Sequence, residues 1–248
     1  MSMYQYMAQK LQEYGIGTYL FDIRGHGNSQ GPRGDAPSAQ QVWIDVSSAI
    51  EFAQKLYQEA PIVLGGHSSG AGLILNYADW KKDSMVTAYV LLAPFLGPRS
   101  DTSYEQKDPE KRFVKKVRLF KLILNMITKG YFFEHDPVVF FNYPTKEKEK
   151  DERLLEAYTC AMSTATTPSD PRAIFGNLSK PFLLLIGEND EQFIPKQILS
   201  FHQSAKFVKE SSISQLLPGA KHLTVVTESP SKIVQGLDNI LKKVLYVP

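Results

Sequence analysis

The chain has 248 residues, of which 43% are hydrophobic and 22% charged, and its formal net charge is +2 at pH 7. This composition is typical of a globular protein and excludes collagen-like and disordered classes. A net charge so close to zero argues against nucleic acid as a general partner. The single cysteine, Cys160, excludes an internal disulfide framework and a multi-thiolate metal site, and we expect it to be a buried or half-buried small apolar residue.

The chain holds no apolar run that approaches the roughly 20 residues needed to cross a bilayer. Residues 1–15 also contain no apolar signal-peptide core. The sequence therefore predicts a soluble, cytoplasmic protein.

The N-terminal part of the chain predicts two helices, a strand and a loop. Residues 3–14 have the periodicity of an amphipathic helix, and residues 18–21 predict a short buried strand that runs into Asp22. Residues 23–37 are rich in glycine and contain two prolines, so they predict a loop. Apolar side chains at helical spacing predict the second helix over residues 42–57.

From there, short apolar strands alternate with helices. Four runs predict buried strands, at residues 61–65, 86–92, 181–186 and 213–217. Helices are expected after the first of these strands, between the last two, and over residues 230–245. This alternation predicts an α/β fold with a mostly parallel, doubly wound sheet.

Residues 95–175 break the alternation, because they are charged, punctuated by prolines and only partly helical. They are best interpreted as an inserted helical cap. The predicted core then comprises residues 1–94 and 176–248.

A nucleophile motif follows the strand at 61–65. Residues 66–70 read GHSSG and match G-x-S-x-G, with a buried strand before them and a helix after them. That strand–turn–helix context is the elbow that exposes a nucleophilic serine, here Ser68. The N-terminus of the helix directs backbone N–H groups toward developing negative charge, so the N–H of Ser69 is a predicted oxyanion donor.

A serine nucleophile needs a base, and the base needs an orienting carboxylate. Asp190 follows the strand at 181–186, and His222 follows the strand at 213–217. Catalytic groups gather at this edge of open α/β sheets. The order Ser68, Asp190, His222 is the one that such folds use, and Glu188 and Glu191 are the rival acids.

The other histidines are interpreted as structural, and the sequence predicts no metal site. We expect His67 to pack beneath the elbow, and His26 lies in the glycine-rich loop. His135 has only adjacent acids, and His202 has no co-ligand one helical turn away.

Four segments together resemble the α/β-hydrolase superfamily: DIRGHGNS at 22–29, GHSSG at 66–70, GEND at 187–190 and PGAKH at 218–222. More narrowly they resemble its monoacylglycerol lipase and lysophospholipase-like branch. The resemblance implies the α/β-hydrolase fold and hydrolysis of an acyl ester through an acyl-enzyme, with no cofactor. Dehalogenases and epoxide hydrolases share the fold but need an aspartate at the elbow, so Ser68 argues against both.

The chain departs from this family at its start. Relatives place a strand ending in His-Gly before the first helix, and the loop after it donates a second oxyanion N–H. We expect such N-terminal strands to be absent here and Met1 not to be the natural start. Upstream residues, a strand of another molecule, or direct pairing of residues 18–22 with 61–65 would then fill the gap.

Two consequences are expected of the chain as given. Open strand edges favour association into a homo-oligomer. Loss of one oxyanion donor costs about 2.7–4 kcal/mol of transition-state stabilisation, so activity should be weak.

The apolar residues of the predicted cap indicate a substrate with an apolar acyl chain. Residues 111–129 are basic, without an acid, and carry an apolar stripe at helical spacing. Such a helix either covers the active site with its apolar side or lies on an anionic membrane surface, and the first interpretation is preferred. Phe113, Phe120 and Phe141 are the predicted walls of the substrate pocket.

Three hypotheses remain open at this point. The leading one is a carboxylic ester hydrolase acting on monoacylglycerols, lysophospholipids or similar lipid-like esters. A peptidase or amidase could use the same three residues, because their geometry does not fix the leaving group. A catalytically impaired binding protein is the third.

Overall fold

The computed structural model describes the chain except for residues 1, 83–84, 106–107, 109–111, 144–153 and 246–248. It divides into two compact units. Unit 1 comprises Met1–Leu20, Ala49–Tyr104 and Thr167–Pro248, and unit 2 comprises Phe21–Ser48 and Glu105–Thr166. The predicted cap, residues 95–175, overlaps unit 2 without coinciding with it, and its role as a cap stays a prediction.

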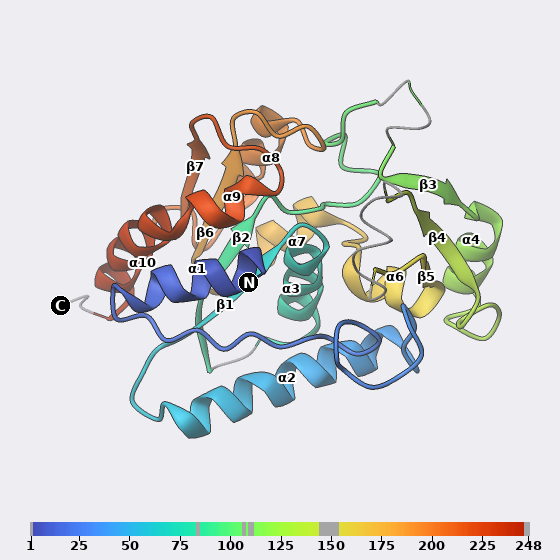
Figure 1. The fold of residues 1–248 in the computed structure, drawn as a ribbon, viewed down its shortest axis with the longest axis horizontal. Helices are drawn as coiled ribbons and strands as arrows, with labels where there is room; N and C mark the ends of the chain where they lie inside the picture. The colour runs from blue at the N-terminus through green and yellow to red at the C-terminus, as the bar shows by residue number, and fades with distance from the viewer. Residues whose placement is uncertain (1, 83–84, 106–107, 109–111, 144–153, 246–248) are drawn as a thin grey trace. The chain divides into compact units, whose positions relative to one another are not determined.

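Unit 1 is built on a sheet of four parallel strands in the order β1-β2-β6-β7 (Figure 1). The strands are β1 (Ile62–His67), β2 (Val86–Leu92), β6 (Phe182–Gly187) and β7 (Ile213–Leu217). Every residue of β6 is buried, as expected for a central strand covered on both faces. All four predicted core strands are therefore confirmed, within one or two residues at their ends.

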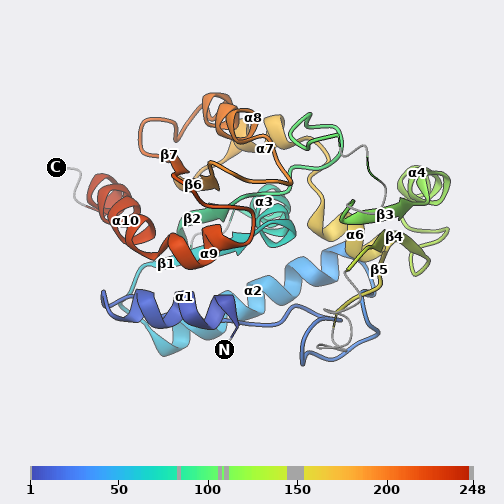
Figure 2. The same ribbon diagram turned by 45° about the horizontal axis from the view of Figure 1, so that its top comes forward.

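Helices cover this sheet. They are α1 (Met3–Gln12), α3 (Ser69–Trp80), α7 (Pro171–Asn177), α8 (Pro195–Ser200), α9 (Thr224–Glu228) and α10 (Pro230–Leu245), with a 3₁₀ turn η2 (Phe201–Ser204). Helix α3 packs on β1 and β2, and α1 packs on α9 and α10 (Figures 1 and 2). Gly236 of α10 lies so close to β6 that a Cβ there would be 2.7 Å from the Leu183 side chain.

Helix α1 starts at a capping box. The hydroxyl of Ser2 accepts the N–H of Gln5, and the Gln5 side chain accepts the N–H of Ser2. This reciprocal pair satisfies two N–H groups that the first turn of a helix leaves free. The predicted N-terminal helix is thus confirmed, with Leu11 buried on its inner face.

The strand predicted at residues 18–21 is wrong. Residues 17–23 form no strand or helix, and Tyr19, Leu20 and Phe21 are exposed. Direct pairing of residues 18–22 with β1 therefore does not occur. An apolar run becomes a buried strand only when a neighbouring strand can accept its backbone hydrogen bonds, and β1 pairs only with β2 among the described residues.

Unit 2 contains an antiparallel sheet in the order β3-β4-β5. Its elements are β3 (Val114–Val117), α4 (Leu119–Ile127), β4 (Pro137–Phe141), β5 (Ala157–Thr159) and α6 (Cys160–Thr166). Helix α2 (Ala39–Leu56) begins in unit 2 and ends in unit 1. The prediction of one continuous helix within residues 111–129 is therefore wrong. Residues 114–117 form a strand that pairs with β4, and residues 119–127 are helical.

The glycine-rich loop that precedes α2 is tied to β5 by two side-chain contacts. The imidazole of His26 bonds to Tyr158 Oη at 2.8 Å, and the carboxylate of Asp35 accepts the hydroxyl of Thr159 at 2.7 Å. Cys160, at the start of α6, is fully buried as predicted, and this burial raises the pKa of its thiol to about 11.

Candidate active site

Ser68 stands at a strained turn between β1 and α3. Its φ of 54° lies in the left-handed region that side chains other than glycine avoid. The backbone holds it there: its N–H donates to Leu92 O at 2.9 Å, and its carbonyl accepts the N–H of Phe95 at 3.0 Å. This strand–turn–helix geometry is the elbow that the sequence predicts.

Close packing explains only one of the two glycines that flank the elbow. A Cβ on Gly66 would lie 2.6 Å from the Gly70 carbonyl oxygen, whereas a Cβ on Gly70 would have nothing within 4 Å. Gly66 is therefore sterically required, and Gly70 is not.

The structure brings Ser68, His222 and Asp190 together in one hydrogen-bonded chain. The hydroxyl of Ser68 lies 3.1 Å from His222 Nε2, and His222 Nδ1 lies 2.9 Å from Asp190 Oδ2. Because a carboxylate only accepts, Nδ1 carries the proton and Nε2 presents its lone pair to the hydroxyl. The Asp190 side chain is fully buried, and that of His222 is 9% exposed.

Backbone donors fix the Asp190 carboxylate in this orientation. Its second oxygen, Oδ1, accepts the N–H groups of Gln192 and Phe193, each at 2.8 Å. The ring of Phe193 stands edge-on to the imidazole of His222, 4.9 Å between centroids. Oδ2 therefore faces His222. The contact with Phe193 also limits rotation of the His222 imidazole.

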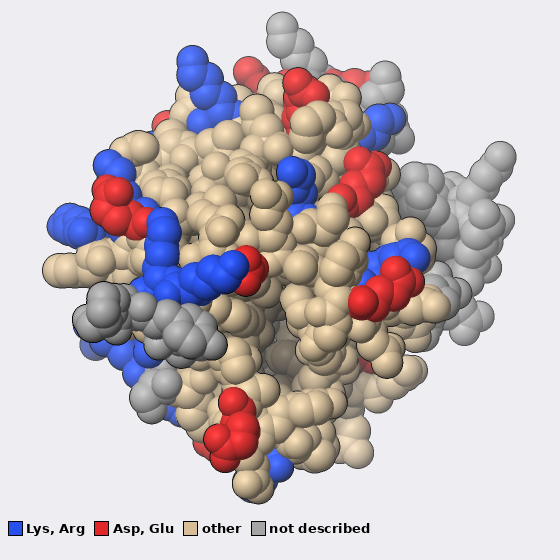
Figure 3. Space-filling view, turned by 90° about the vertical axis from the view of Figure 1, so that its left-hand side faces the viewer, with Lys and Arg blue, Asp and Glu red and all other residues tan. Residues whose placement is uncertain are grey.

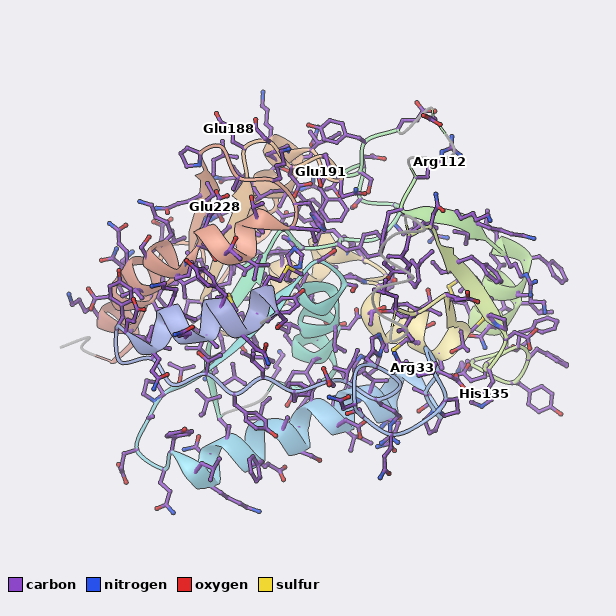
Figure 4. All side chains as sticks on the ribbon, in the orientation of Figure 1. Arg33, Arg112, His135, Glu188, Glu191 and Glu228 are labelled. Carbon is purple, nitrogen blue, oxygen red and sulfur yellow. The ribbon has the colours of Figure 1, made fainter. Side chains whose placement is uncertain are left out.

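The rival acids contact the histidine loop elsewhere. The Glu188 carboxylate accepts the N–H of Gly219, and that of Glu191 accepts the N–H of His222, both at 3.1 Å. Both glutamates come from the loop after β6, whereas Glu228 comes from α9 (Figure 4). Neither Glu188 nor Glu191 occupies the position beside His222 Nδ1.

A hydrogen-bonded pair, the buried His67 and the half-buried Tyr4, lies behind His222. His67 Nε2 lies 2.9 Å from the His222 carbonyl oxygen, so it carries the proton and donates; the Tyr4 hydroxyl then donates to His67 Nδ1 at 3.0 Å. Burial, together with the nearby His222, lowers the pKa of His67 to about 4. Burial also raises the pKa of Tyr4 to about 12.

Ser69, the predicted oxyanion donor, is the first residue of α3. Its N–H finds no backbone acceptor in the described part of the chain, as is usual for the first turn of a helix. A donor in this state is available to a ligand.

The three predicted pocket residues lie in unit 2. Phe113 and Phe141 belong to an aromatic cluster, with ring centroids 5.3 Å apart, while Phe120 of α4 is 72% exposed. That they form the walls of a substrate pocket stays a prediction.

Unit 2 has a cavity of its own, of about 520 Å³, lined by residues that include Arg33 and His135 (Figure 4). His135 Nδ1 bonds to the Asp35 carboxylate at 3.0 Å. Ser68, Asp190 and His222 all belong to unit 1 and do not line this cavity.

Charge is mixed on the face drawn in Figure 3, where basic and acidic side chains are interspersed over a larger neutral area. No helix among the described residues has both the length and the apolar character that a membrane span requires.

Comparison with known proteins identifies the family. A family model described as serine aminopeptidase, S33, matches residues 1–229. A monoglyceride lipase homolog of Monkeypox virus is 24% identical over 228 residues, 88% of this chain and 76% of that protein. The monoglyceride lipase of Rattus norvegicus is 30% identical over 127 residues, 51% of this chain. The chain spans only 40% of the length of that rat lipase.

Solved structures show the same fold. The crystal structure of a soluble variant of monoglyceride lipase from Saccharomyces cerevisiae matches with a TM-score of 0.69 and 17% identity, covering 97% of this chain and 82% of that one. The chain therefore belongs to the family described as serine aminopeptidase, S33, and it has the α/β-hydrolase fold.

Proposed function

We propose that the protein is a serine hydrolase that cleaves carboxylic esters, with Ser68 as nucleophile, His222 as general base and Asp190 as the acid that orients it. The observation that carries this proposal is the continuous chain of hydrogen bonds, 3.1 Å from Ser68 to His222 and 2.9 Å from His222 to Asp190. Both distances lie within the reach of about 2.6–3.2 Å that proton transfer needs.

The reaction follows from these contacts. As the hydroxyl oxygen of Ser68 attacks the ester carbonyl carbon, its proton passes to His222 Nε2, and Asp190 stabilises the imidazolium. The imidazolium then gives that proton to the leaving alcohol, which leaves an acyl-enzyme on Ser68. Water, deprotonated by the same nitrogen, releases the acid and restores the serine.

The tetrahedral intermediate carries a negative oxygen that needs donors. We assign one of them to the N–H of Ser69, which starts α3 and has no backbone acceptor among the described residues. A second donor is not assigned.

Lipid-like esters, such as monoacylglycerols or lysophospholipids, are the proposed substrates. The names of the viral, rat and yeast relatives support this class, and so do the exposed apolar side chains of α4. The family description names an aminopeptidase, which keeps amide hydrolysis as the alternative. Esters of graded chain length, assayed beside matched amides, separate the two.

The test of the proposal is covalent labelling by a fluorophosphonate probe. We expect Ser68→Ala to abolish both labelling and ester turnover and to keep the circular-dichroism spectrum, because the change removes a single hydroxyl. A variant that keeps more than a trace of esterase activity would show that another residue is the nucleophile. A wild-type chain with neither labelling nor turnover would favour the binding-protein hypothesis.

Helix α4 supports a further proposal, peripheral contact with a lipid surface. Its exposed stripe consists of apolar residues, Leu119, Phe120, Ile123, Met126 and Ile127, each between 48% and 72% exposed. The exposed bases Lys115 and Lys116 precede it on β3. A basic element beside an exposed apolar stripe favours an anionic membrane surface over water.

Cytoplasmic location stays a prediction. A final proposal is that two copies of the chain associate through β1. The outer edge of β1 pairs with no strand among the described residues. Its sequence, IVLGGH, contains no lysine, acid or proline of the kind that keeps an edge from pairing. Sedimentation across a concentration range tests this.

A further inference from the structure

The main chain of His222 is held at both of its polar atoms by side chains. Its N–H donates to Glu191 Oε2 at 3.1 Å, and its carbonyl accepts His67 Nε2–H at 2.9 Å. His222 is buried, and no backbone carbonyl accepts its N–H in the described part of the chain. Because buried N–H groups need an acceptor, Glu191 supplies what the backbone does not.

Glu191 belongs to a set of contacts that join the loop after β6 to the loop after β7. Glu188 N–H donates to Leu217 O at 2.9 Å, and Asn189 N–H donates to Ala220 O at 2.8 Å. Gly187 permits this approach, because a Cβ there would lie 2.4 Å from the Ala220 carbonyl oxygen. Within this set, Glu191 is the residue whose carboxylate reaches the backbone of His222.

Two adjacent acids thus hold different atoms of the same histidine. Asp190 holds ring Nδ1, and Glu191 holds the main-chain N–H. A ring that is bonded at Nδ1 and packed against Phe193 can still shift with its own main chain, and that shift moves Nε2 relative to the serine. Fixing the main chain as well removes this freedom, because both ends of the side chain are then anchored.

We propose that Glu191 is a positioning residue for the hydrolysis proposed above, on which this inference rests. Its carboxylate keeps the His222 main chain, and through it Nε2, at hydrogen-bond distance from the Ser68 hydroxyl. Misalignment of His222 lowers the rate, because a displacement of a catalytic group by about 1 Å can reduce the rate on the order of 10²-fold. A loosened histidine that still finds the serine part of the time should lose about tenfold.

The experiment compares three variants with the wild type, using a short-chain ester and a fluorophosphonate probe. Glu191→Ala removes the acceptor. Glu191→Gln keeps an oxygen that can accept the His222 N–H but removes the charge. Glu188→Ala is the matched control, because it removes an equal charge and an equivalent 3.1 Å bond, to Gly219, from the same loop. Thermal unfolding midpoints of all four proteins separate alignment from stability.

The expected result has three parts. In Glu191→Ala, kcat and the labelling rate fall about tenfold, while KM stays within about twofold, since the contact that is removed is one to the His222 main chain. Glu191→Gln recovers most of the loss. Glu188→Ala stays within about twofold of the wild type in kcat.

Several results would overturn the inference: an unchanged kcat in Glu191→Ala, no recovery in Glu191→Gln, or an equal loss in Glu188→Ala. Failure of the proposed function looks different. In that case the wild type itself shows neither labelling nor turnover, or Ser68→Ala retains them, before any glutamate variant is compared.

Discussion

At the scale of single residues, the site depends on buried groups that keep one protonation state. His67 is the clearest of these, because it accepts from Tyr4 and donates to the His222 carbonyl. The bond to the His222 carbonyl requires a proton on Nε2, and the bond accepted from Tyr4 requires Nδ1 to be unprotonated, so the ring is neutral. Burial and the proximity of His222 lower its pKa to about 4, so the neutral form persists well below neutral pH.

This pKa predicts how stability depends on pH. The unfolded chain protonates His67 near its ordinary value of 6.5, and the folded chain does so only near 4. The unfolded state therefore binds more protons between these values, and stability is lost as the pH falls from about 6.5 toward 4. A difference of this size is worth about 3 kcal/mol.

Urea unfolding of the wild type and of His67→Gln at several pH values measures the effect. Glutamine keeps a donor for the His222 carbonyl and an acceptor for Tyr4 but does not titrate, so its unfolding free energy should fall less between pH 6.5 and 4. Parallel curves for wild type and His67→Gln would refute the assignment.

At the scale of elements, the elbow between β1 and α3 requires glycine at only one of the two glycine positions of its motif. Gly66→Ala should destabilise the protein and lower turnover, because the new Cβ meets the Gly70 carbonyl at 2.6 Å. Gly70→Ala should keep or raise the unfolding midpoint, since nothing lies within 4 Å and alanine is preferred to glycine in a helix by about 1 kcal/mol. Equal unfolding midpoints for the two variants would contradict this account.

The exposed stripe of α4 gives a second prediction for an element. Replacing Phe120 and Ile127 by serine should reduce co-sedimentation with phosphatidylserine-containing vesicles by about tenfold or more, because each apolar side chain contributes about 1.5–3 kcal/mol when buried. Phe52→Ser, which changes an exposed phenylalanine of unit 1, is the control. Unchanged sedimentation of the double variant would argue against lipid contact.

Sequence patterns predict an element well where the residues of that element alone determine its structure. β2 has its predicted bounds because seven mostly buried residues lie between turns. Residues 18–21 carry an equally apolar pattern, but a strand also needs a partner, and nothing in a local pattern reports one. Residues 114–117 fail for a related reason: their pairing with β4 is formed with residues more than 20 positions away.

At the scale of the whole molecule, the candidate site also has parts that a local sequence pattern predicts and parts that depend on residues far apart in the chain. Ser68, Asp190 and His222 could be predicted because each follows a recognisable strand. The contacts of Tyr4 with His67 and of Glu191 with His222 span 63 and 31 positions, and no motif records them. Ring contacts such as that of Phe193 with His222 likewise come only from the fold.

The predicted substrate wall concerns the whole molecule, because the proposed nucleophile, Ser68, belongs to unit 1 and the three phenylalanines belong to unit 2. Phe141→Ala should weaken hydrolysis of long-chain esters more than that of acetate esters, since each buried methylene contributes roughly 0.8 kcal/mol. The ratio of kcat/KM for the two esters measures this. Equal losses on both, with a lowered unfolding midpoint, would mean that Phe141 serves only the aromatic cluster.

The buried thiol of Cys160 makes the two units separately observable. It is the single cysteine of the chain and lies in unit 2, with its pKa raised to about 11, so alkylating reagents meet a protonated and enclosed sulfur while that unit is folded. Labelling of Ser68 depends on unit 1. Pulse alkylation and active-site labelling of one sample during heating would therefore time the opening of each unit, with no engineered probe.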